Sequence, residues 1–333
     1  MPQRRDYIDE LKGLGILLVV VGHFIEQYRM GYSFVSASFF CIYAFHMALF
    51  CICSGLVARF NPRKLVTQQL WLYLVGQTLM LAFRAVVLRE NFAETGGLLA
   101  AWLLPWRHIW YLYALIFWHL TLPVLCRLRD RLGLAGSCLG MALALAAGLV
   151  DWPFTLVRVF AFYPFYACGV LLRPQLDRLA AFAAEHRPVR LVAAAGLVLG
   201  YGAYFLWVLR ADPIMDHSAE LFHDVSYAGG DRVQYRVVFY LVGIVTTAAL
   251  TVLASRRHLL AGLGRHTLAI YLLHLPVQAL LVELGLYDLM RGKATIVVVL
   301  WSVLLAAVTL AVLNLSPVQR ACDAVANCWY KRK

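Results

Sequence analysis

The chain has 333 residues, of which 62% are hydrophobic and only 14% are charged, and its mean hydropathy is +0.72. Soluble domains are about 45–50% apolar and about 25% charged, so this composition excludes an ordinary soluble protein and indicates an integral membrane protein. We interpret the net charge of +12 as a result of membrane topology and attraction to anionic lipid, and expect no nucleic-acid partner.

Apolar runs long enough to cross ~30 Å of hydrocarbon as helices recur along the whole chain. They predict an all-α, polytopic integral membrane protein with about ten transmembrane helices. No long hydrophilic stretch interrupts them, so residues 1–333 are expected to form a single membrane-embedded domain. The expected spans are about 11–28, 34–57, 68–88, 108–126, 132–150, 154–172, 190–209, 235–255, 266–286 and 293–314.

The connections between these spans differ in charge. Lys and Arg concentrate in the connections that share one side when the N-terminus is cytoplasmic, so the positive-inside rule predicts cytoplasmic N- and C-termini, including the tail 315–333. Connection 173–190 is expected to be a short amphipathic helix on the inner side. Segments 89–107 and 210–234 are expected on the outer side, the first as a re-entrant or interfacial piece. The cysteines lack the spacing of a zinc site, and no metal is expected.

The first apolar run, LKGLGILLVVVGHFIEQY, contains Lys12, His23 and Glu26. At ~100° per residue, Lys12 and His23 differ by only about 20° around a helix, and Asp9 and Glu26 fall in the same sector. Ionisable side chains within a span are costly and face protein or a water-filled cavity. The stripe therefore predicts one polar cavity, with Lys12 at its inner end and His23 about 16 Å away in its outer half.

His23 is the best candidate for chemistry in this stripe. Histidine takes up a proton near neutral pH, and Glu26, one turn on, is placed to orient the ring or hold its proton. The alternative is a buried histidine that only ties helices together. For Lys12, snorkelling to the inner headgroups is the alternative to a role in a site.

Three later spans carry further candidates. His274 shares a helix face with Gln278, and both a structural and a functional histidine fit this pattern. His108, Trp110 and Tyr111 lie at the start of the fourth span, either as an interfacial aromatic belt or as part of a site. Arg158 precedes an aromatic cluster within the sixth span, where it is placed to line a cavity for an anionic or sugar group.

Five segments resemble, in order, the signatures of the membrane acyltransferase 3 family, with most similarity to its fucose 4-O-acetylase-like branch. The resemblance covers essentially the whole chain. The segments are DYIDELKGLGILLVVVGHF (6–24), FHMALFCICSGL (45–56), HIWYLYALIFW (108–118), RVFAFYPFYACGVLL (158–172) and GRHTLAIYLLHLPV (264–277).

The resemblance implies ten spans and transfer of an acyl group from cytoplasmic acyl-CoA to hydroxyls of extracytoplasmic glycans. The family hallmark of a basic residue, ten intervening residues and a histidine maps onto Lys12 and His23, which implies that His23 is catalytic and that Lys12 lies near the donor. Many members also have arginines at the start of the third span that meet the CoA phosphates. Here Gln68 and Gln69 stand in that region.

The leading hypothesis is an O-acetyltransferase of the bacterial inner membrane that uses acetyl-CoA on the cytoplasmic side and a glycan or lipid-linked sugar as acceptor. The expected roles are catalysis for His23 and Glu26, donor binding for Lys12, Arg63 and Lys64, and acceptor binding for His274, Arg158, Trp110 and Tyr111. One alternative is a secondary transporter that uses the same polar residues as a relay, against which the lack of an internal repeat counts weakly. A non-catalytic membrane scaffold is a third reading.

Overall fold

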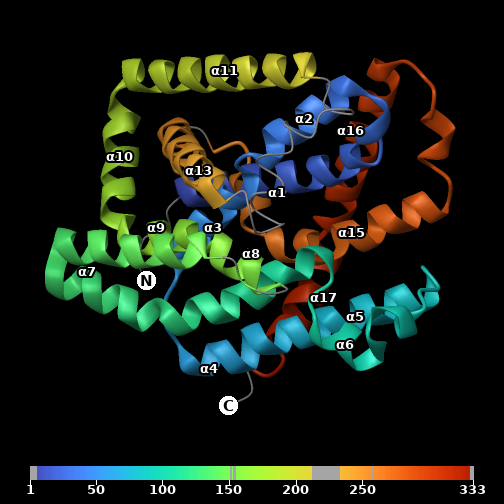
Figure 1. Ribbon diagram of the computed structural model, residues 1–333, viewed down its shortest axis with the longest axis horizontal. Coiled ribbons are helices and arrows are strands. Elements are labelled where there is room, and N and C mark those ends of the chain that lie inside the picture. Colours follow the sequence, from blue (N-terminus) through green and yellow to red (C-terminus); the bar gives the residue numbers. More distant parts are fainter. Residues whose placement is uncertain (1–5, 151, 153–154, 212–232, 257, 331–333) are drawn as a thin grey trace.

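The computed structural model describes residues 6–150, 152, 155–211, 233–256 and 258–330, and every regular element in these ranges is a helix (Figure 1). The longer helices are α1 (Asp6–Glu26), α2 (Ser33–Tyr43), α3 (His46–Val57), α5 (Trp71–Val86), α7 (Trp110–Leu149), α10 (Arg173–Glu185), α11 (Arg187–Arg210), α13 (Val233–Ala254), α15 (Thr267–Glu283), α16 (Thr295–Leu313) and α17 (Ser316–Asn327). The shorter ones are η1 (Arg29–Gly31), α4 (Pro62–Lys64), the π-helical η2 (Leu65–Leu70), η3 (Phe92–Thr95), α6 (Gly97–Leu103), η4 (Arg107–Ile109), α8 (Leu156–Ala161), α9 (Tyr163–Leu171), α14 (Ala261–Gly264) and η6 (Asp288–Met290).

Each of the ten expected spans coincides with one or more of these helices, which confirms the all-α prediction. The short helix expected over 173–190 is present as α10 (Arg173–Glu185), which begins at a proline-containing first turn, and its side of the membrane stays a prediction. Most of the expected outer segment 210–234 lies outside the described residues.

Length and composition alone identify fewer membrane spans than the sequence predicts. Five helical stretches of the described chain are long and apolar enough to cross a membrane, or six if the pair α8–α9 and α10, bent by 67°, is one span. The other expected spans have a physical reason to fail this test: α1 contains Asp9, Glu10 and Lys12, and α5 and α15 have 16 and 17 residues. The number ten and the cytoplasmic termini stay predictions.

Several expected spans are interrupted. α2 and α3 are separated at Ala44 and Phe45, and α8 meets α9 at Phe162. Within α7 the chain reverses at Gly133, whose φ of 55° and ψ of −127° suit a residue without a Cβ, so α7 is a hairpin of two arms (Figure 1). The two arms correspond to the separate spans expected on either side of residue 131.

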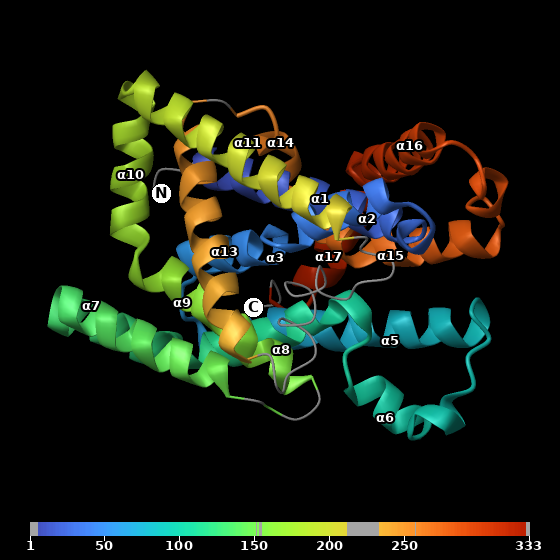
Figure 2. The same cartoon turned by 45° about the horizontal axis from the view of Figure 1, so that its top comes forward.

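The core forms where α1 and α3 cross the middle of the molecule. α1 packs against α3, α14 and α16, while α3 packs on α9, with α10 and α11 framing one side (Figure 2). Gly55 and Gly169 face each other across the α3–α9 contact, and a Cβ on Gly169 would lie 2.1 Å from the carbonyl oxygen of Ile52. Such small residues allow helix backbones to approach closely inside a membrane. This packing fixes α3 beside α1 and so positions the site between them.

Candidate functional site

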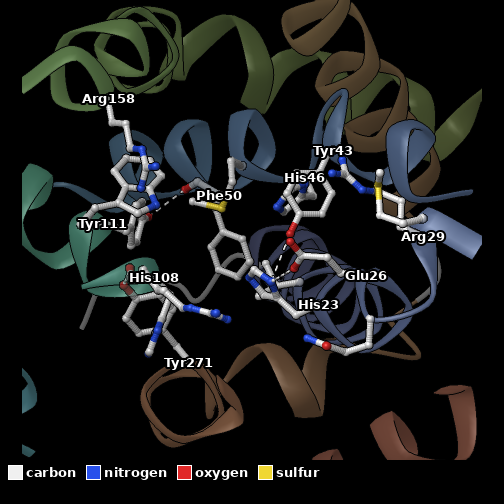
Figure 3. Close-up of a pocket in the computed structure, with 16 residues that line it drawn as sticks. His23, Glu26, Arg29, Tyr43, His46, Phe50, His108, Tyr111, Arg158 and Tyr271 are labelled. Atoms are coloured by element: carbon white, nitrogen blue, oxygen red, sulfur yellow. Dashed lines mark hydrogen bonds and ion pairs between the residues drawn. The ribbon is translucent and has the colours of Figure 1, made fainter. Parts of the chain in front are cut away.

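A cavity of about 510 Å³ opens at the Glu26 end of α1 (Figure 3). Its walls come from α1, the break between α2 and α3, the start of α7, α8 and α15. The lining includes His23, Glu26, Arg29, Tyr43, His46, Phe50, Arg107, His108, Trp110, Tyr111, Arg158 and Tyr271. Residues distant in the sequence therefore meet where several helices begin or end.

His23 lies on the wall of this cavity and is paired with Glu26. Its Nδ1 is 3.1 Å from Oε2 of Glu26 and 3.1 Å from the hydroxyl of Tyr43, as Figure 3 shows. An ionised carboxylate only accepts hydrogen bonds, so this contact favours a proton on Nδ1 and leaves Nε2 with a free lone pair. The amide of Gln278 donates to the His23 carbonyl oxygen at 2.5 Å and ties α15 to this turn of α1. These contacts hold His23 in one orientation on the cavity wall.

Two more histidine side chains pack in a row with His23. The ring centroids of His23 and His274 are 5.3 Å apart, and those of His274 and His108 are 5.1 Å apart. Nδ1 of His274 donates to two backbone carbonyls of its own helix at 2.9 Å, and Nε2 of His108 donates to Leu272 O at 3.2 Å. Within the described chain no group of three metal-ligating side chains is suitably arranged for a metal ion.

His274 is fully buried and is not among the residues that line the cavity. Its expected contact with the acceptor stays a prediction. His108 does line the cavity, although sequence reasoning assigned it no role in the site. Trp110 and Tyr111 are 4% and 7% exposed and line the same cavity, a placement that does not fit an interfacial belt.

A second cavity, of about 380 Å³, lies further along α3. It is lined by Ser54, Arg59, Asn61, Lys64, Gln69 and His119, among others. The expected donor residue Lys64 is therefore on a cavity wall, whereas Arg63 is exposed and is not among the lining residues. Arg59 lines this cavity instead of Arg63. It lies two residues before the basic segment 61–64 (NPRK), and this position is the sequence signal that could have identified it.

The two cavities meet at one hydrogen-bonded pair. Ser54 lines the second cavity and Tyr111 lines the first, and their hydroxyl oxygens are 2.5 Å apart. The Tyr111 hydroxyl also donates to the carbonyl oxygen of Phe50 at 3.2 Å. Because that hydroxyl has a single proton, Ser54 is the donor toward Tyr111.

Lys12 lines neither of these two cavities, so the expectation of one cavity running from Lys12 to His23 was wrong. Its ammonium instead lies 3.6 Å from Asp9, which is also 3.8 Å from the guanidinium of Arg265. Lys12 lies near enough to Cys53 of α3, the neighbour of Ser54, for its charge to act on that residue. It contributes to the electrostatics beside the second cavity.

Comparison with known families agrees with this geometry. The family model described as an acyltransferase domain, that of acyltransferase 3, matches residues 5–316. The chain belongs to the acyltransferase 3 family. The match includes both cavities, and together with the long apolar helices it identifies a membrane acyltransferase. No curated protein and no solved structure matches the chain.

The sequence of this acyltransferase 3 family member predicted the polar stripe of α1, but it did not predict every residue that lines the His23 cavity. Tyr43, Arg29 and Arg107 line the cavity but were not singled out as site residues, because Tyr43 lies within the expected span 34–57 and the two arginines lie just outside expected spans. Only the breaks between helices bring them to His23. The roles assigned to the predicted site residues stay predictions.

Proposed function

We propose that this acyltransferase moves an acetyl group from cytoplasmic acetyl-CoA to a hydroxyl of an extracytoplasmic glycan or lipid-linked sugar, in the bacterial inner membrane. The observation that carries the proposal is the His23–Glu26 pair on the wall of a large cavity within helical, apolar surroundings. Charged and polar groups are placed in such surroundings when they handle substrate or protons.

In the proposed reaction, Nε2 of His23 takes the proton of the acceptor hydroxyl. The hydroxyl oxygen attacks the thioester carbonyl carbon, the C–S bond breaks, and the proton passes from His23 to the CoA thiolate. Glu26, 3.1 Å from Nδ1, stabilises the imidazolium that exists between these proton transfers. The acetyl group becomes an ester, and free CoA is the other product.

The second cavity supports donor binding from the opposite side. Arg59 and Lys64 are suited to CoA phosphates, because basic side chains form charge-assisted hydrogen bonds with phosphate oxygens. The acetyl-bearing arm would then pass the Ser54–Tyr111 pair to reach His23. Lys12 and Arg63 line neither cavity, so they would add positive charge near the second cavity without contacting the bound acetyl-CoA.

The test supplies radiolabelled acetyl-CoA to sealed inside-out vesicles and measures label in the glycan fraction. We expect His23→Ala to reduce labelling by about 100-fold or more, since general-base catalysis contributes about 10²–10⁴-fold. His186→Ala is the matched control, because His186 is exposed at the end of α10 and away from both cavities. Equal labelling by His23→Ala and wild type, at equal protein levels, would refute the proposed role of His23. Transport of a solute without labelling would favour a transporter instead.

A further inference from the structure

A third cavity, of about 480 Å³, lies between α11 and α13 and is here called the α11–α13 cavity. Small residues make room for it, because several of the residues on its wall have no side chain beyond a methyl group. They are Ala44, Ala193, Gly196, Gly200 and Ala249. A Cβ on Gly196 or Gly200 would meet no atom within 4 Å. Side chains of the protein therefore leave this space open.

The wall of the α11–α13 cavity is suited to hydrocarbon and not to a polar ligand. Among the described residues that line it, none is charged. The hydroxyl oxygens of Tyr201 and Thr246 are 2.9 Å apart, so these two polar groups bond to each other. A sugar or a CoA phosphate placed here would lose its hydrogen bonds to water without replacing them. The fitting occupant is an apolar chain.

The same cavity is open to the surroundings of the protein on its lipid-compatible side. α11 has 24 residues and is apolar enough to cross a membrane, yet Val208 is its only buried residue. The helix runs along one edge of the molecule (Figure 1). Val245, on the cavity wall, is 65% exposed. Because an apolar helix without a protein cover has lipid tails as its solvent, a hydrocarbon chain can enter this cavity directly from the bilayer.

The break between α2 and α3 connects the α11–α13 cavity to the His23 cavity. Ala44 lines the first, and the neighbouring Tyr43 lines the second, with its hydroxyl 3.1 Å from Nδ1 of His23. The ring of Phe45 packs against that of Tyr201, with centroids 5.2 Å apart. Consecutive residues of one break therefore belong to the walls of both cavities.

We propose that the α11–α13 cavity holds the hydrocarbon chain of a lipid-linked acceptor, whose sugar enters the His23 cavity. The inference rests on the proposed function and specifies its acceptor class. Lipid tails are as apolar as the cavity wall, so contact with hydrocarbon gives little preference over the bilayer. What the cavity contributes is position, because a chain held beside the α2–α3 break keeps the attached sugar close to His23. A phospholipid would fill the same space without presenting a sugar hydroxyl.

The first experiment asks whether the natural product carries a hydrocarbon chain. Inside-out vesicles that contain the native acceptor are labelled briefly with radioactive acetyl-CoA, and the extracted product is passed over an octyl resin, which retains molecules with such a chain. We expect the labelled glycan to be retained. Labelled glycan that passes through the resin overturns this inference alone, whereas no label in any glycan overturns the proposed function as well.

The second experiment fills the cavity with protein side chains. We expect Gly196→Leu and Gly200→Leu each to reduce labelling by about 10-fold or more, since misplacing a substrate by about 1 Å can cost about 100-fold. The affinity for acetyl-CoA should not change, because donor binding is assigned to another cavity. Gly202→Leu is the matched control, since Gly202 also lies on α11 with no atom within 4 Å of a Cβ but does not line the cavity.

Thermal unfolding of the three variants separates a folding defect from an effect on the acceptor. We expect all three to unfold at the wild-type temperature, because each added side chain enters open space. Equal labelling by the three variants overturns the proposal and leaves bilayer phospholipid as the occupant of the cavity. An equal loss in Gly202→Leu overturns it too, because the effect would then belong to α11 as a whole.

Discussion

Replacing Glu26 by Gln isolates the contribution of one negative charge to the proposed reaction. The substitution keeps the size of the side chain and leaves an oxygen that can accept from Nδ1 of His23 at the present separation of 3.1 Å. What it removes is the attraction between a carboxylate and the imidazolium that forms when His23 takes the acceptor proton. The neutral ground state loses much less, so the effect should fall on turnover.

The magnitude follows from distance and exposure. Two unit charges about 4 Å apart interact by about 4 kcal/mol at an effective dielectric constant of about 20. The side chains of His23 and Glu26 are 21% and 36% exposed, so solvent screens part of this energy. A hydrogen bond to a charged group is worth about 1.5–3 kcal/mol, which we take as the expected loss. That loss corresponds to a reduction of kcat by about 10- to 100-fold.

The assay measures acetyl transfer by the purified protein in lipid nanodiscs, with kcat and the acceptor KM determined separately. We expect Glu26→Gln to lower kcat with a change in KM below about 3-fold, and Glu26→Asp to retain more activity because it keeps the charge. Glu283→Gln, at the exposed end of α15, serves as the matched control. Wild-type kcat in Glu26→Gln would refute the reasoning, and a change confined to KM would show that Glu26 binds the acceptor instead.

Four further outcomes are expected from other parts of the structure. Gly169→Ala should destabilise the protein by about 1–3 kcal/mol in thermal unfolding, because the added Cβ meets a carbonyl of α3, whereas Gly200→Ala has open space around it and should be neutral or better. Tyr111→Phe should increase acceptor-independent hydrolysis of acetyl-CoA several-fold, since it removes the hydroxyl between the two cavities; unchanged hydrolysis would contradict a separating role. Lys12→Ala should raise the KM for acetyl-CoA more than that for the acceptor, because Asp9 then loses a positive neighbour beside the donor side. Arg84, whose Nε donates to Glu90 at 2.7 Å, holds the pKa of that carboxyl below 4.5, so the stability lost in Glu90→Gln should be measurable at pH 6 and should vanish as the pH falls through the lowered folded-state pKa.

The sequence predicted α1 well because one simple periodicity governs it. Lys12, His23 and Glu26 needed only the helical repeat to be placed on one side, and the His23–Glu26 contact follows directly from their spacing. The same repeat also places Asp9 one turn from Lys12, but spacing alone does not decide whether Lys12 pairs with Asp9 or faces a cavity.

The cavity wall was harder to predict for a different reason. Hydropathy marks a continuous apolar run from residue 34 to 57, but the run breaks at Ala44 and Phe45 without a proline or glycine to signal it. That break brings Tyr43 to His23 and His46 to the cavity. His108 was missed because an aromatic-rich start of a span looks the same whether it faces lipid or a site.

The arrangement of charge explains why two cavities suit the proposed reaction better than one. In the proposed reaction acyl-CoA and the acceptor are two different molecules, so a single cavity would let either substrate occupy the place of the other. Here Arg59 and Lys64 belong to one cavity, and Arg29, Arg107 and Arg158 belong to the other. Between them stands a neutral pair, Ser54 and Tyr111, joined by one hydrogen bond. The acetyl thioester is also neutral, so it is the one part of either substrate that can pass this point without carrying a charge through apolar surroundings.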